Sequence, residues 1–82
     1  MPKSIFSFGQ EKLQEVLRQA RLDAELSQVE LAKKLRRPQS FVSKYESGER
    51  RLDLVELREI CQALGISLIK LTNRFEKALK IK

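Results

Sequence analysis

Residues 26–51, LSQVELAKKLRRPQSFVSKYESGERR, contain two short helix patterns that are separated by a turn. The first begins after Ser27, whose hydroxyl can accept a hydrogen bond from an unpaired backbone N–H, and Glu30 completes a capping box. Pro38 suits the first position of the second helix, and Gly48 can end that helix in the left-handed conformation. The stretch therefore predicts helices over residues 28–35 and 38–47.

The same helix-start pattern occurs twice more, as LDLVEL at 52–57 and ISLIKL at 66–71. Asp53 and Ser67 are the capping residues, and apolar residues flank each cap at the spacing of a hydrophobic staple. With two prolines, three glycines and no alternating apolar pattern, the chain favours an all-α fold. We expect five helices, at about 8–23, 28–35, 38–47, 54–64 and 68–79. The fourth should turn Leu54, Leu57, Ile60, Cys61 and Leu64 towards the core.

Length and composition exclude several classes of protein. Eighty-two residues, 41% of them hydrophobic and 34% charged, predict one globular domain over residues 1–82. One cysteine, Cys61, and no histidine argue against an internal disulfide, a metal site and an enzyme, so we expect no cofactor. No apolar run approaches membrane-spanning length and no signal peptide is evident, so we expect a cytoplasmic protein without membrane contact.

Positive charge is concentrated in two blocks. Residues 33–51 have a net charge of +5 and residues 67–82 a net charge of +4, whereas the formal charge of the whole chain is +6. The segments between these blocks are acidic, so the positive field should have a preferred side. Polyanions are the usual partners of such a field.

The predicted helix over 38–47 has two different sides. At about 100° per residue, its inner side holds Pro38, Phe41, Val42 and Tyr45. The outer side presents one amide, three hydroxyls and one ammonium group, on Gln39, Ser40, Ser43, Lys44 and Ser47. An exposed side that serves solubility alone usually mixes both charge signs, and this one has no carboxylate. Its groups can bond base edges and phosphate oxygens, which predicts a nucleic-acid surface.

Three segments, LSQVELAKKL, FVSKYESGER and LREICQALGIS, together resemble the Cro/cI-type (XRE-like) helix-turn-helix family of bacterial and phage regulators. The resemblance covers residues 13–71 without an insertion. It implies a compact, five-helix, lambda-repressor-like domain whose second and third helices form the helix-turn-helix. It also implies sequence-specific binding of double-stranded DNA by a transcriptional regulator, a repressor, with helix 38–47 in the major groove of palindromic half-sites.

The resemblance assigns roles to individual residues. The predicted base contacts are Gln39, Ser40, Ser43 and Lys44. The predicted phosphate contacts are Gln28, Arg36, Arg37, Arg50 and Arg51. Arg21 and Glu46 match a structural ion pair of some family members. Two positions depart from the family pattern: Arg36 stands where glycine is frequent, and Pro38 stands where serine or threonine often caps the third helix.

The last helix continues an apolar stripe beyond the usual domain, in a basic extension over residues 72–82. We expect Leu68, Thr72, Phe75 and Leu79 to contact a second copy in a homodimer, although the stripe could instead cover the underside of its own domain. An antitoxin that holds a toxin and binds DNA secondarily is an alternative function. A controller of a restriction–modification system is a variant of the regulator.

Overall fold

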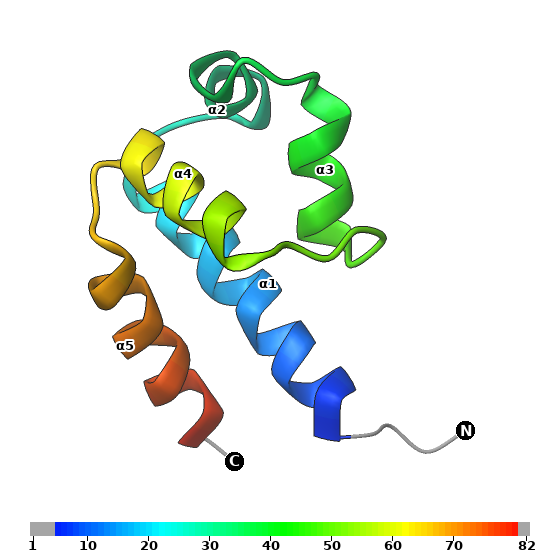
Figure 1. Cartoon of the computed structure of the whole chain (residues 1–82), viewed down its shortest axis with the longest axis vertical. Coiled ribbons are helices and arrows are strands. Elements are labelled where there is room, and N and C mark those ends of the chain that lie inside the picture. The colour runs from blue at the N-terminus through cyan, green and yellow to red at the C-terminus, as the bar shows by residue number, and fades with distance from the viewer. Residues whose placement is uncertain (1–4, 81–82) are drawn as a thin grey trace.

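The computed structural model describes residues 5–80, with the backbone alone for residues 5–7. This part of the chain forms five helices and no strand, which confirms the all-α prediction: α1 (Ile5–Asp23), α2 (Gln28–Leu35), α3 (Gln39–Ser47), α4 (Leu54–Leu64) and α5 (Leu68–Lys80). In Figure 1, α3 and α5 lie on opposite sides of the molecule, with α1 and α4 between them. Residues 1–4 and 81–82, at the ends of the predicted domain and of its basic extension, lie outside the described residues.

The predicted capping residues begin three of the helices. Ser27 accepts from the Glu30 N–H at 3.0 Å, and the Glu30 carboxylate accepts from the Ser27 N–H at 2.8 Å. Asp53 and Glu56 form the second capping box, with distances of 2.7 and 3.0 Å. Ser67 accepts from the Lys70 N–H at 3.0 Å. These bonds satisfy N–H groups that have no partner within their own helix, so they fix where each helix starts.

Some helix ends differ from the prediction. Helix α1 begins at Ile5, three residues earlier than expected, and α3 begins at Gln39 because Pro38 is an extended N-cap with ψ 154°. Arg36 ends α2 in the left-handed region, at φ 57°. A second non-glycine residue, Glu25, adopts φ 60° directly after α1. In the turn between α2 and α3, the backbone of Arg36 is therefore strained, because residues other than glycine rarely adopt the left-handed region.

One hydrophobic core holds the helices together. Helix α1 packs against α3 and α5, α2 packs against α3 and α4, and α4 packs against α5. The most buried large side chains come from every helix and are Leu17, Leu31, Val42, Tyr45, Ile60, Cys61 and Leu71. Ala32 is 2% exposed where α2 meets its neighbours, and its small side chain permits a close approach of the helices.

The apolar surface differs from the prediction in two places. Leu54, expected in the core, is 65% exposed because it is the first residue of α4, and its neighbour Val55 is 66% exposed. The predicted stripe on α5 is divided: Leu71 is buried and Leu68 packs against the core, whereas Thr72 is exposed. Part of the stripe thus packs on α1 and α4 of its own domain, and part stays accessible.

Candidate nucleic-acid interface

Helix α3 is held down by its inner side and free on its outer side. Phe41, Val42 and Tyr45 are 7%, 0% and 1% exposed, and the two aromatic rings meet edge to face at 5.5 Å. Of the outer residues, Gln39, Ser40, Lys44 and Ser47 are exposed and Ser43 is half-buried. A helix of two to three turns is marginally stable alone, so this buried side is what holds the outer side in place.

A buried ion pair joins α3 to α1. The Arg21 guanidinium donates to both carboxylate oxygens of Glu46, at 2.8 and 3.0 Å. The two side chains are only 9% and 5% exposed. Arg21 also donates to the Leu26 carbonyl at 2.8 Å, which ties the turn before α2 to the same group. The hydrogen bond to Glu46 raises the pKa of Arg21, so this guanidinium stays charged at any physiological pH.

The same carboxylate orients two amides at the outer surface. Gln28, the first residue of α2, donates to Glu46 Oε1 at 3.0 Å. The side-chain oxygen of Gln28, Oε1, in turn accepts a hydrogen bond from Gln39 Nε2 at 3.3 Å. Gln39 keeps one amide proton and its carbonyl oxygen for a ligand, which is the donor–acceptor pattern that pairs with adenine. Glu46 therefore supports the predicted base-reading face although it is buried beneath it.

The hydroxyls of the outer face are engaged with the backbone. Ser43 donates to the Ser40 carbonyl at 3.4 Å, and Ser47 donates to the Lys44 carbonyl at 3.1 Å. Their oxygens can still accept hydrogen bonds. Lys44 is exposed, and within residues 5–80 its ammonium has no hydrogen-bond or ion-pair partner. It is the cation of this face that is most available to a ligand.

Two of the predicted phosphate-binding arginines are turned towards the domain. Arg37 and Arg50 stack on the Phe41 ring, with guanidinium carbons 4.3 and 4.8 Å from its centroid. Arg50 also forms a two-pronged pair with Glu56, at 2.8 and 3.1 Å. This pair lowers the pKa of Glu56 to about 2. Arg37 lies 3.9 Å from the same carboxylate. The structure thus gives both arginines a role in joining the flanks of α3 to α4.

The other two arginines face outward. Arg36 and Arg51 are exposed, and neither guanidinium has a hydrogen-bond or ion-pair partner among the described residues. They stand at opposite ends of α3, Arg36 in the turn before it and Arg51 in the loop after it. Gln28 retains one amide proton and lies at the start of α2, where helix N–H groups favour an anion.

Sequence patterns missed the roles of Phe41 and Glu56. Phe41 was expected on the inner side of α3, and the structure also stacks the guanidinium groups of Arg37 and Arg50 on its ring. Glu56 forms the capping box with Asp53 and also pairs with Arg50, which the helix-start pattern does not indicate. The signal for Phe41 was the four arginines, Arg36, Arg37, Arg50 and Arg51, on either side of an aromatic pair, a composition that favours cation–π stacking.

The described residues contain no cluster of three or more potential metal-ligating side chains. Within the same residues, no helix has the length and apolar character required to cross a membrane. Burial also raises the pKa of the Cys61 thiol, which makes it a poor nucleophile.

Comparisons with known proteins agree with this geometry. A family model described as "Helix-turn-helix" matches residues 17–71. An XRE-family like protein from Pseudomonas syringae pv. tomato str. DC3000 is 41% identical, with a TM-score of 0.83 over 89% of each chain. An arginine-to-alanine variant of the restriction-modification controller protein C.Esp1396I is 25% identical, with a TM-score of 0.85 over 89% of this chain and 97% of that one. The clp gene regulator ClgR from C. glutamicum is 26% identical, with a TM-score of 0.79 over 95% and 96%. A comparison with curated protein sequences gives no match.

Proposed function

The chain belongs to the XRE-like (Cro/cI-type) helix-turn-helix family of DNA-binding regulators, and from this membership we propose that it represses transcription by reading palindromic half-sites. Helix α3 enters the major groove. Gln39, Ser40, Ser43 and Lys44 contact base edges, while Gln28, Arg36 and Arg51 contact phosphates. Arg37 and Arg50 contribute mainly by holding the flanks of α3.

The observation that carries this proposal is the outer face of α3. It is exposed, it lacks carboxylates, and a buried carboxylate orients its first amide through Gln28. Solubility alone does not require hydrogen bonds that orient an exposed amide. Pre-oriented donors and acceptors reduce the entropy that is lost on binding, which suits direct readout of bases.

Selection of bound duplexes from a random DNA pool tests the proposal. The expected result is a symmetric site with half-sites about one helical turn apart. Lys44→Ala should relax discrimination at one base position by about 1–3 kcal/mol. Arg51→Ala, which removes an exposed cation assigned to phosphate, should weaken all duplexes alike. If Lys44→Ala kept the parent's preference at every base, the assignment of this face would be wrong.

Two half-sites require two copies of the chain. We propose that the flank of α5 formed by Leu68, Thr72, Phe75 and Leu79 contacts the second copy. Helix α5 lies on the side of the molecule away from α3, so a partner there leaves the DNA-facing side open (Figure 1). Thr72 is exposed, so Thr72→Glu should give monomers in analytical ultracentrifugation without unfolding the domain. Asn73, exposed about 100° further round α5, provides the control: if Asn73→Glu dissociated the dimer and Thr72→Glu did not, the contact would lie elsewhere.

The similarity to a restriction-modification controller favours one variant of the proposed function. In this variant the protein regulates the genes of a restriction–modification system by binding their operator. Genes for a restriction enzyme and a methyltransferase beside the coding sequence would support this variant. The toxin-binding alternative gains no support from the comparisons.

A further inference from the structure

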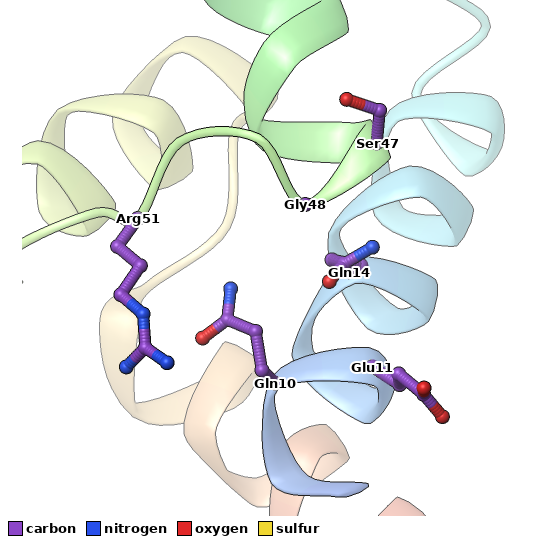
Figure 2. Close-up of a pocket in the computed structure, with 6 residues that line it drawn as sticks. All are labelled: Gln10, Glu11, Gln14, Ser47, Gly48 and Arg51. Atoms are coloured by element: carbon purple, nitrogen blue, oxygen red, sulfur yellow. The ribbon is translucent and has the colours of Figure 1, made fainter. Parts of the chain in front are cut away.

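An open recess lies between α1 and the loop that follows α3 (Figure 2). It has a volume of about 350 Å³ and is lined by Gln10, Glu11, Gln14, Ser47, Gly48 and Arg51. Gln14 fixes one wall, because its amide donates to the Glu46 carbonyl at 3.2 Å. Gly48 permits this contact, since a Cβ there would lie 2.9 Å from Gln14 Oε1. The recess is therefore a defined feature of the α1–α3 contact.

Two side chains can donate hydrogen bonds into the recess. The Arg51 guanidinium has no partner among the described residues, and the Gln10 amide points into the space beside it (Figure 2). Ser47 offers no proton there, because its hydroxyl donates to the Lys44 carbonyl at 3.1 Å or to the Glu49 carboxylate at 3.3 Å. The one carboxylate of the lining, on Glu11, points away from Arg51. A cation with an adjacent amide donor suits an anion with several oxygens, such as a phosphodiester.

The recess borders the end of the predicted DNA-reading face. Ser47 belongs both to its lining and to the outer side of α3, while the Gln28–Gln39 pair marks the opposite end of that helix. With nine residues, α3 is about 13 Å long. The major groove of B-DNA is about 12 Å wide. Donors near both ends of α3, Gln28 at one and Arg51 at the other, are therefore available to backbone phosphates beside the groove.

We propose that the recess binds one phosphodiester of the DNA backbone, with Arg51 as its cationic ligand and Gln10 of α1 as its second donor. This inference rests on the proposed function and deepens it, since it adds α1 to the DNA-binding surface. Binding at both ends sets the depth and tilt of α3 in the groove.

Duplexes in which single phosphates are replaced by neutral methylphosphonates test this inference directly. For the parent protein on its selected site, replacement should weaken binding at each contacted phosphate. Arg51→Ala should remove the effect at one phosphate per half-site and leave the others unchanged. Gln10→Ala should reduce affinity about 2- to 10-fold and diminish the effect at the same phosphate.

Lys70→Ala is the matched control, because it removes one exposed positive charge from α5, away from α3. Arg51→Ala should reduce the slope of log affinity against log salt by about 1 per bound copy, whereas Lys70→Ala should change it little. If Arg51→Ala keeps every methylphosphonate effect and matches Lys70→Ala in slope, the recess binds no phosphate although the protein binds DNA. If the parent protein binds no duplex, the proposed function fails as well.

Discussion

The buried pair of Arg21 and Glu46 yields the sharpest stability prediction. Arg21→Met keeps an apolar chain of similar length and leaves the Glu46 carboxylate, 5% exposed, without its cation. Breaking a buried pair in this way costs about 3–5 kcal/mol. Domains of this size have a free energy of unfolding of about 4–12 kcal/mol at 0.05–0.15 kcal/mol per residue, so the variant should lose a large share of its stability. The melting temperature should fall by about 12–40 °C.

The structure contains a matched control for this experiment. Arg74 and Asp23 form an ion pair with the same 2.8 Å distance, but these side chains are 31% and 52% exposed. Water and salt screen an exposed pair, so Arg74→Met should cost about 1 kcal/mol or less. Urea denaturation followed by circular dichroism compares the two variants under identical conditions. Equal losses in the two variants would refute the reasoning that burial decides the contribution of the Arg21–Glu46 pair.

A double variant separates folding from function. In Arg21→Met/Glu46→Leu neither buried charge remains, so most of the lost stability should return. The Gln28 amide, however, no longer has the carboxylate that receives its proton, and Gln39 is held only through Gln28. DNA affinity should therefore stay below that of the parent even at temperatures where both proteins are folded. Full recovery of affinity would show that Glu46 supports the fold alone.

Three further outcomes follow from single groups. Tyr45→Phe should raise the free energy of unfolding by about 1 kcal/mol in urea denaturation, because the buried hydroxyl has no hydrogen-bond partner among the described residues. Arg36→Gly should relieve the strain at φ 57° and raise the melting temperature by a few degrees, while the lost cation weakens DNA binding measured by fluorescence anisotropy. Glu56→Gln should make stability less dependent on acid: its pKa lies below the ordinary value of 4.5, so ionised Glu56 stabilises the parent above pH 4.5, and this contribution disappears as the pH falls towards 2. Equal acid sensitivity in the parent and Glu56→Gln, measured by denaturation across that pH range, would contradict the assignment of the Arg50–Glu56 pair.

Local chemistry made most of the fold predictable. The bond between Ser27 and Glu30 depends on residues three positions apart, and so does the one between Asp53 and Glu56. The core positions follow from helical spacing for the same reason. Arg36 was recognised as a departure from the family's glycine, and the structure gives it the left-handed φ that this position requires.

Contacts between distant segments set the limit of prediction. The hydrogen bond from Gln14 to Glu46 joins residues 32 positions apart, and no pattern within either helix indicates it. Likewise, Leu54 fits the apolar spacing of α4, but as the first residue of that helix it is 65% exposed. The recess on α1 was not predicted because Gln10 carries no motif, and only the packing of α1 against the α3–α4 loop brings it beside Arg51.

The arginines show how this limit affects function. Arg50 and Arg51 are adjacent and chemically identical, yet Glu56 and the Phe41 ring hold the first while the second has no partner in the described chain. Of the five cations from Arg36 to Arg51, two are therefore engaged internally, and three per copy, Arg36, Lys44 and Arg51, remain for DNA. At about 0.9 per neutralised phosphate, two copies account for a salt slope of about −5 from these residues, whereas counting all five cations gives about −9. The net charge of the sequence thus overstates how strongly salt should weaken binding, because Arg37 and Arg50 contact Phe41 and Glu56 instead of DNA.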